Sequence, residues 1–200
     1  MRAARAMSER GLSAGTSGNV SARVAEGMVV TPSALPYAEM TEGDLVTLAL
    51  DGSVLEGERK PTTEWRLHAA VYRTRADVQA IVHAHAVFCT TLSALRREIP
   101  AFHYLVGIAG GDSIRCAPYA SFGSPELAAQ AVAALEGRRA CLLANHGMVA
   151  LGATPEGALD LAAEVEGLAE LYWRALQVGE PVLLTAEEMA DALERLAEYR

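Results

Sequence analysis

Val78-Gln79-Ala80-Ile81-Val82-His83-Ala84-His85 is the stretch around which the rest of the chain is organised. Its alternation of apolar and polar residues predicts a half-buried strand that ends on two histidines. Because side chains alternate faces along a strand, His83 and His85 should emerge on the same side. Two imidazoles at one rigid strand end are typical of a site for zinc or another transition metal. A His-x-His pair is a weak motif by itself, but Thr62-Thr63-Glu64 adds a carboxylate and Asn145-His146-Gly147 adds a third imidazole.

The composition is that of a globular protein without a basic face. Two hundred residues with 51% apolar content predict one domain over residues 1–200 with a sizeable core. The 17 basic and 25 acidic residues give a formal net charge of -8. This charge argues against nonspecific binding to nucleic acid or to anionic membranes, because both favour a basic surface. It does not exclude a small anionic ligand, which responds to local hydrogen-bond donors.

Cysteine usage and the N-terminus point to the cytoplasm. Cys89, Cys116 and Cys141 are odd in number, widely spread and free of any Cys-x-x-Cys pattern, so we expect a reducing compartment. Residues 1–7 lack the apolar run of a signal peptide, and no segment approaches the ~20 apolar residues of a membrane span. The expectation is a soluble cytoplasmic protein.

The rest of the pattern predicts a mixed order of elements. Helices are expected at 1–10, 61–75, 86–97, 125–135, 155–176 and 186–198, and strands at 19–23, 28–31, 44–50, 53–55, 78–85, 101–104, 113–119, 140–144 and 148–151. The strands at 44–50 and 53–55 form a hairpin across Asp51-Gly52. This order suggests an α/β fold of α/β/α layers, with a central, largely antiparallel sheet covered by helices on both faces.

Two polar stretches precede the histidine strand. In Gly15-Thr16-Ser17-Gly18-Asn19, the glycines allow positive φ, so backbone N–H groups could form a concave site for an anion. The alternative is a tight turn before a strand, and the local sequence favours the turn. Thr62 or Thr63 suits the N-cap of the next helix, whose N-terminus favours an anion. Glu64 there could simply stabilise the helix dipole, and helix-face reasoning makes His68 structural.

Taken together, these stretches predict a metal site beside a phosphate pocket. Three histidines at strand ends are the ligand set of a catalytic zinc with an open fourth position, which Glu64 could occupy until substrate arrives. Residues 16–19, 33–34 and 62–63 are rich in neutral donors, and no GxxxxGK[ST] nucleotide loop is present. The set therefore fits a small phosphorylated molecule better than a nucleotide.

Several motifs in this order and spacing resemble the class II aldolase/adducin family. They are GTSGNVSAR at 15–23, TPSALPY at 31–37, KPTTEWRLH at 60–68, HAHAVFCTTLS at 83–93, IPAFHYLVGIAGGDSIRCAPYASFG at 99–123 and NHGMVA at 145–150. The resemblance covers almost the whole chain. It implies an α/β/α fold with an antiparallel sheet, a zinc ion, and a homotetramer with active sites at subunit interfaces.

The resemblance also assigns roles to residues. It implies zinc bound by His83, His85 and His146, with Glu64 as a displaceable ligand and acid/base. It implies a phosphate held by six residues: Gly18, Asn19, Ser33, Ala34, Thr62 and Thr63. Tyr104 matches a tyrosine that a neighbouring subunit offers to the aldehyde oxygen, Tyr199 a mobile C-terminal tyrosine, and Phe122 an aromatic near the aldehyde pocket. The chain departs from the family at position 34, where glycine is usual.

The activity implied is a zinc-dependent aldolase, with another divalent cation as an alternative. It would cleave L-fuculose 1-phosphate, or a similar ketose 1-phosphate, to dihydroxyacetone phosphate and L-lactaldehyde through a metal-stabilised enediolate. Alternatives within the fold are a methylthioribulose-1-phosphate dehydratase and aldolases for 5-deoxy or 5-methylthio sugar phosphates. An epimerase fits less well, because related epimerases carry aspartate where this chain has Glu64. A noncatalytic adducin-like interaction module lacks a complete metal set, whereas all four residues are present here.

Overall fold

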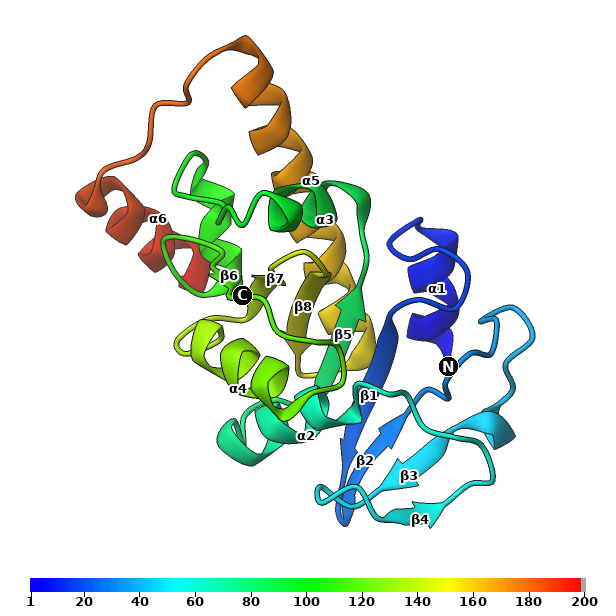
Figure 1. Ribbon diagram of the computed structural model, residues 1–200. Coiled ribbons are helices and arrows are strands. Elements are labelled where there is room, and N and C mark those ends of the chain that lie inside the picture. Colours follow the sequence, from blue (N-terminus) through cyan, green and yellow to red (C-terminus); the bar gives the residue numbers. More distant parts are fainter. Residues whose placement is uncertain (199–200) are drawn as a thin grey trace.

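An eight-stranded sheet lies at the centre of the structure, a computed structural model that describes residues 1–198 (Figure 1). The strands lie in the order β4-β3-β2-β1-β5-β8-β7-β6. Neighbouring strands are antiparallel except for β6 and β7, which are parallel. The strand bounds are β1 Asn19–Val24, β2 Gly27–Val30, β3 Val46–Leu48, β4 Val54–Glu56, β5 Ala80–Ala84, β6 Cys116–Ala117, β7 Ala140–Leu143 and β8 Gly147–Gly152.

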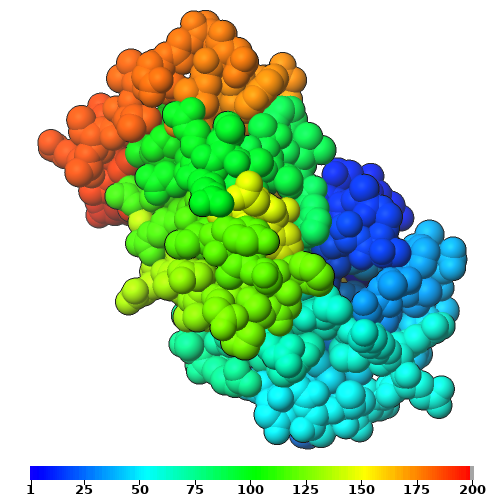
Figure 2. Space-filling model, viewed as in Figure 1, coloured from blue at the N-terminus to red at the C-terminus, as the bar shows by residue number. Residues whose placement is uncertain are grey.

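Helices cover both faces of the sheet, so the predicted α/β/α layers are confirmed (Figure 1). Helices α1, α3 and α5 share one hydrophobic core with the sheet, and α2 and α4 share the core on the other face. In Figure 2 the N-terminal residues (blue) border segments from the middle of the chain (green). The helix bounds are α1 Arg2–Glu9, α2 Trp65–Thr74, α3 Val87–Ala94, α4 Pro125–Ala134, α5 Pro155–Val178 and α6 Ala186–Glu198, with short 3-10 helices η1 Glu42–Asp44 and η2 Tyr104–Ala109.

Strand β5 forms within the predicted segment 78–85, but it is not half-buried as predicted: all five of its residues are buried, because helices cover both faces of the sheet. Ala80, Val82 and Ala84 pack into the core under α1, α3 and α5. Ile81 packs into the core under α2 and α4, and His83 follows two residues later on that same face. The strand ends at Ala84, and His85 lies just beyond it. The two histidines therefore leave the sheet on the side of α2.

The long helices begin where their capping residues predict. Ser124 Oγ accepts a hydrogen bond from the N–H of Leu127, and Pro125 takes the first helical position of α4. Thr154 Oγ1 accepts from the N–H of Gly157 at the start of α5 in the same way. Because both caps are local, sequence alone sufficed to place these two starts.

The region after α3 differs from the prediction. The sequence predicts a strand at 101–104, but residues 104–109 form η2, whose start is capped by the His103 ring accepting from the N–H of Leu105. The strand predicted at 113–119 shrinks to Cys116–Ala117, because Pro118 has no N–H with which to continue the ladder.

Three other element ends also move. The helix predicted at 86–97 ends at Ala94. The strand predicted at 44–50 is reduced to β3, because Thr41 and Asp44 form a capping box that makes residues 42–44 a 3-10 turn. Helix α2 begins at Trp65, and Glu64 itself is at the N-cap without a capping hydrogen bond, so neither Thr62 nor Thr63 is the N-cap. The Glu64 side chain is thereby free to turn away from its helix.

Within residues 1–198, no helix combines the length and the apolarity that crossing a membrane would require.

A carboxylate from α5 holds the turn that joins the histidine strand to α3. Glu166 Oε1 accepts from the N–H of Phe88 at 2.7 Å, and Oε2 accepts from the N–H of Cys89 at 2.8 Å. These N–H groups belong to the first turn of α3, where they have no partner within the helix. The N-cap of α3 is Ala86, whose side chain cannot accept a hydrogen bond. Glu166 supplies the cap that the local sequence lacks.

Replacing Glu166 with alanine should lower the free energy of unfolding by about 1–3 kcal/mol, because two N–H groups lose a charged acceptor. Chemical denaturation followed by circular dichroism measures the change. Glu164→Ala removes an exposed carboxylate from the same helix and should cost less than about 0.5 kcal/mol. Equal losses in the two variants would contradict the capping role of Glu166.

Candidate active site

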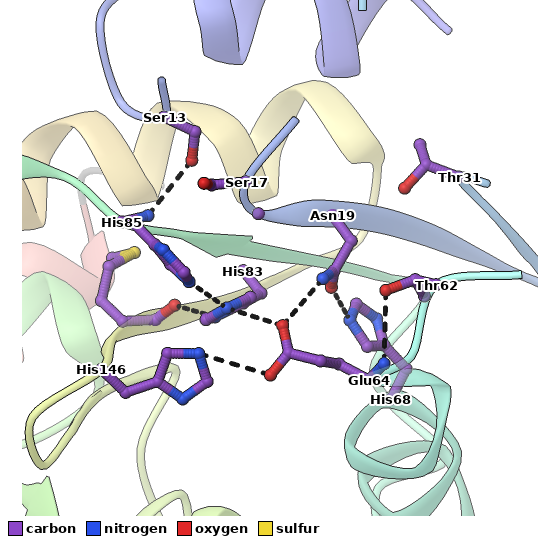
Figure 3. Close-up of polar contacts among 12 residues, drawn as sticks. Ser13, Ser17, Asn19, Thr31, Thr62, Glu64, His68, His83, His85 and His146 are labelled. Atoms are coloured by element: carbon purple, nitrogen blue, oxygen red, sulfur yellow. Dashed lines mark hydrogen bonds and ion pairs between the residues drawn. The ribbon is translucent and has the colours of Figure 1, made fainter. Parts of the chain in front are cut away.

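Three imidazoles and one carboxylate converge at the end of β5 (Figure 3). His83 Nε2 lies 2.9 Å from His85 Nε2 and 3.0 Å from Glu64 Oε2. His146 Nε2 lies 3.4 Å from Glu64 Oε1. One ligand atom from each of the four residues lies within 4.8 Å of the other three. The structure thus brings together the four residues that the sequence nominates as metal ligands.

The register of the sheet and a glycine turn place these side chains. Asn19 of β1 lies directly opposite His83 of β5, so the two side chains are neighbours on the face that α2 covers. His146 precedes β8, which pairs with β5 on the other side. A Cβ on Gly147 would lie 2.5 Å from the backbone oxygen of Ala84, so a larger residue would push His146 away from the cluster.

The hydrogen bonds of His83 leave one of its nitrogens for a ligand. Its Nδ1 lies 2.9 Å from the carbonyl oxygen of Met148, which can only accept, so Nδ1 carries the proton in the neutral ring. The lone pair of Nε2 then points toward the cluster. An outer carbonyl that fixes the tautomer in this way is typical of metal-binding histidines.

The donor set fits a divalent cation. Glu64 Oε1 is buried and accepts no hydrogen bond, so a cation at the cluster would satisfy it. Neutral imidazole nitrogens only 2.9 Å apart repel one another when both present lone pairs, and a shared cation removes that repulsion. Three imidazoles with one carboxylate suit zinc, and other divalent transition metals accept the same ligands.

Burial and the charges within the cluster shift the pKa values of Glu64, His85 and His146 toward the protonation states that bind a metal. Burial opposes ionisation of Glu64, but the charge and hydrogen bond of His83 outweigh it and lower the Glu64 pKa below its usual value. Burial, followed by the charge of His83, lowers the pKa of His85 and of His146 to about 4. Burial also opposes protonation of His83, but the Glu64 carboxylate raises the pKa of His83. His85 and His146 are therefore neutral at neutral pH, and a metal would compete with a proton for the lone pair of the His83 ring.

A cleft with a volume of 330 Å³ opens beside the cluster. Its walls come from six separate chain segments, one of which ends at Glu64, the N-cap of α2. The lining residues are Thr16, Ser17, Gly18, Asn19, Pro32, Ser33, Ala34, Thr62, Thr63, Glu64, His85, Tyr119, Ala120, Phe122, Asn145 and His146. All six residues nominated for phosphate binding are among them, as is Phe122. None of these lining residues is lysine or arginine, so an anion there would be held by neutral donors.

The backbone of the cleft is tightly fitted at two positions. Gly18 has φ +75°, and a Cβ there would lie 2.6 Å from Ser13 Oγ and 2.7 Å from the backbone oxygen of His83. The glycine therefore serves close packing against the histidine strand as well as the turn. Ala34 has φ 57°, the left-handed region that costs an alanine free energy, which explains why glycine is usual at this position.

One nominated tyrosine, Tyr104, does not line the cleft of its own chain. Tyr104 lies on η2 with 51% of its surface exposed, and it lines a separate groove between η2 and α6. Tyr199 lies outside the described residues. Phe122 is at the rim of the cleft with 71% of its surface exposed.

Sequence reasoning missed three residues that shape the cleft. The Tyr37 hydroxyl donates to the carbonyl oxygen of Gly18 at 2.7 Å and so supports the glycine turn from beneath. Ser13 Oγ accepts from the N–H of His85. Tyr119 lines the cleft opposite the glycine turn. Tyr37 ends the TPSALPY motif and Tyr119 lies within the motif at 99–123, so either motif could have drawn attention to them; Ser13 carries no comparable signal.

Comparison with known proteins finds similarity to aldolases in sequence and in structure. The family model described as "Class II Aldolase and Adducin N-terminal domain" matches residues 1–173. A 5-methylthioribulose-1-phosphate/5-deoxyribulose-1-phosphate aldolase of Rhodospirillum rubrum is 50% identical over 98% of this chain and 89% of its own length. An L-fuculose phosphate aldolase of Escherichia coli is 48% identical over 96% of this chain and 90% of its own length. The solved structure of an L-fuculose 1-phosphate aldolase, 42% identical, superimposes with a TM-score of 0.94 over 98% of this chain and 93% of its own.

The cluster predicts about one divalent cation bound per chain. Alanine at His83 or His146 should lower the affinity for zinc by well over tenfold, because a site built on three histidines is weakened strongly when any one of them is removed. Elemental analysis and competition with a chromogenic chelator measure content and affinity. His103 is the only one of the five histidines that belongs neither to the cluster nor to the hydrogen bond between His68 and Asn19. His103→Ala should therefore keep its metal. Loss of metal in the control variant would show that the cluster is not the site.

Proposed function

The chain belongs to the class II aldolase and adducin family and is an aldolase, a carbon–carbon lyase, and on that premise we propose that it cleaves a ketose 1-phosphate between C3 and C4. The products would be dihydroxyacetone phosphate and a short aldehyde. The observation that carries the proposal is the convergence of three imidazoles and Glu64 at one end of a cleft lined by neutral donors. The three free thiols, Cys89, Cys116 and Cys141, fit a reducing cytoplasmic compartment.

His83, His85 and His146 would hold the metal, with zinc as the first choice, and Glu64 would be the ligand that the substrate displaces. A bound divalent cation supplies Lewis-acid chemistry, because it stabilises negative charge on the oxygens beside the breaking bond. His83 lies in β5, and His85 and His146 directly adjoin β5 and β8, whereas Glu64 sits at the N-cap of α2 with no capping bond to break. Glu64 is therefore the one ligand that can move without disturbing the fold.

The phosphate would lie at the end of the cleft formed by Gly18, Ser33 and Thr63 and the other neutral residues named above. The N-terminus of α2 adds the positive end of the helix dipole. Hydrogen bonds from neutral groups suffice for this role. A lysine or arginine here would compete with the metal for Glu64.

Glu64 would move the proton at C3. After the C3–C4 bond breaks, Glu64, having taken up a proton from water, would deliver it to C3, the carbon that becomes the hydroxymethyl carbon of dihydroxyacetone phosphate. In synthesis the carboxylate would remove that proton and return it to water. The free Oε1 is the atom suited to this transfer, because Oε2 already accepts from Asn19 at 3.0 Å. General acid–base catalysis of this kind is worth about 100- to 10,000-fold in rate.

A second copy of the chain would supply the group that acts on C4. Tyr104 is exposed and is not among the residues that line the cleft of its own chain, as expected for a residue offered to a neighbour. In a cyclic homotetramer, the Tyr104 phenolate of one copy would take the proton from the C4 hydroxyl in the cleft of the next and become the phenol. Tyr199 would assist there.

The aldehyde end of the substrate would be short and partly apolar. Tyr119 and Phe122 line the cleft with half or more of their surfaces exposed, and both rings offer apolar contact to a methyl or methylthio group. The names of the relatives describe aldolases for substrates that end in such groups. L-Fuculose 1-phosphate, 5-deoxyribulose 1-phosphate and 5-methylthioribulose 1-phosphate are therefore the substrates that we propose to test.

Purified zinc-loaded protein should cleave at least one of these three phosphates and release dihydroxyacetone phosphate, which a coupled dehydrogenase assay detects. Glu64→Gln should slow the exchange of the C3 proton of dihydroxyacetone phosphate with deuterium oxide by about 100- to 10,000-fold. Proton NMR measures that exchange. Loss of water from methylthioribulose phosphate without cleavage would instead identify a dehydratase.

Mixing two impaired variants tests the subunit arrangement. Tyr104→Phe should slow cleavage yet leave the C3 exchange intact, because the two residues act on different atoms. Dissociated and reassembled mixtures of Tyr104→Phe and Glu64→Gln should recover up to about a quarter of the wild-type activity, since random assembly of a heterologous ring pairs two intact groups in that share of sites. Activity no higher than that of the separate variants would place Tyr104 in the cleft of its own chain or outside catalysis.

A further inference from the structure

A buried chain of hydrogen bonds leads away from the candidate active site beneath α2, and Figure 3 shows its first part, from Glu64 through Asn19 to His68. It starts at Glu64, whose Oε2 accepts from Asn19 Nδ2 at 3.0 Å. Asn19 Oδ1 lies 2.5 Å from His68 Nε2, and His68 Nδ1 lies 2.7 Å from Ser21 Oγ. Ser21 Oγ lies 2.8 Å from the Tyr72 hydroxyl, where the chain ends.

The members beyond Glu64 are shut off from solvent. His68 has no exposed surface, and Ser21, Tyr72 and Asn19 are 2%, 2% and 3% exposed. Asn19 alone among these four lines the cleft. His68, Ser21 and Tyr72 therefore cannot touch a substrate, and whatever effect they have on the reaction must pass through Asn19.

Each hydrogen bond in the chain can run in only one direction. Ionised Glu64 only accepts, so Asn19 must offer it the amide N–H and present Oδ1 to His68. The neutral His68 ring must then carry its proton on Nε2 and accept from the Ser21 hydroxyl at Nδ1. Ser21 has one hydroxyl proton, so Tyr72 must donate to Ser21. The Tyr72 hydroxyl therefore sets the direction of every bond up to the carboxylate.

Burial and charge keep His68 in that one state. Burial, followed by the charge of His83, lowers the His68 pKa to about 3, so the ring stays neutral throughout the physiological range. Arg23 lies over the Tyr72 ring, with its guanidinium carbon 4.6 Å from the ring centre, and also donates to the Tyr72 carbonyl oxygen. The far end of the chain is thus anchored between β1 and α2.

We propose that His68, oriented by Ser21 and Tyr72, is a positioning residue that locks the Asn19 amide so that Asn19 holds Glu64 Oε2 while Oε1 transfers the proton at C3. This inference rests on the proposed role of Glu64. A flipped Asn19 amide would place Oδ1 against Glu64 Oε2, two acceptors facing each other without a proton. The lock matters most once substrate has displaced Glu64 from the metal, because Asn19 then remains to hold the carboxylate over C3.

The proton pattern of His68 can be observed directly in the zinc-loaded wild-type protein. Nitrogen-15 NMR of histidine-labelled protein should show His68 protonated on Nε2 and unprotonated on Nδ1 between pH 6 and 9, with a slowly exchanging Nε2 proton. A proton on Nδ1, or a cationic ring in this range, would overturn the proposal whatever the enzyme does.

Substitution tests the consequence for catalysis. His68→Leu should slow both cleavage and C3 proton exchange by the same factor, about 10- to 100-fold as for other residues that orient a ligand or base. KM for the sugar phosphate and the zinc content should not change. His68→Gln, whose amide can still donate to Asn19, should recover much of the lost rate. An exchange rate in His68→Leu equal to that of wild type would overturn the proposal.

A matched control separates positioning from stability. Leu67 is the neighbouring buried residue of α2, 2% exposed, and it belongs to the hydrophobic core. Leu67→Ala should lower the melting temperature at least as much as His68→Leu does, yet leave the exchange rate per folded molecule unchanged. Equal slowing of exchange by the two variants would show that His68 contributes only stability.

A double-mutant cycle tests whether the effect passes through Asn19. In an Asn19→Ala background, His68→Leu should cause no further slowing of C3 exchange, because the residue through which it acts is gone. Independent, multiplicative losses would overturn the proposal. If His68→Leu does not fold, Ser21→Ala provides the same test, because it frees His68 Nδ1 and should slow exchange severalfold.

These outcomes also separate this inference from the proposed function. Wild-type enzyme that shows no C3 exchange at all would sink the role of Glu64 and the positioning role together. Wild-type enzyme that exchanges the proton, with His68→Leu exchanging it equally fast, would leave the aldolase proposal standing and remove only this one.

Discussion

The structure depends on the cost of burying the Glu64 carboxylate within a close cluster of four ligand atoms. Glu64 and His83 are almost fully buried, and their nearest atoms are 3.0 Å apart. A buried carboxylate without compensation is expensive, and no lysine or arginine lines the cleft to supply it. Compensation has to come from the imidazoles, from Asn19 and from a divalent cation. The fold therefore positions these groups close to one another.

The fold positions these groups because adjacent strands with opposite directions bring distant residues into register. Asn19 pairs with His83 across β1 and β5, and Ser21 pairs with Ile81 two residues further along. On the face toward α2, Asn19, Ser21 and His83 make polar contacts, whereas Ile81 packs into the hydrophobic core. A shift of one residue in this register would turn Asn19 and Ser21 into the opposite core. Catalytic geometry and the hydrophobic core are thus fixed by the same pairing.

Much of this could be predicted from the sequence, and the limits have a physical cause. Local patterns placed β5, the capped starts of α4 and α5, and the three histidines, because alternation and capping are properties of neighbouring residues. The His68 chain could not be found that way, since it requires knowing that β1 pairs with β5 and that α2 covers both. The strand predicted at 101–104 failed for a related reason: the His103 cap that forms η2 has no standard sequence pattern.

The neutral character of the cleft follows from the same electrostatics. A cationic side chain beside Glu64 would pair with its carboxylate, hold it away from C3 and repel the metal at short range. Backbone N–H groups, hydroxyls and amides bind phosphate with dipoles instead, and dipoles leave the charge of Glu64 uncompensated except by the cluster. The net charge of -8 is compatible with an anionic substrate for this reason. Under the proposed function, a small set of oriented donors at the N-terminus of α2 and in the turn at Gly18 would attract the phosphate through dipoles, so the overall negative charge of the chain does not decide its affinity for the substrate.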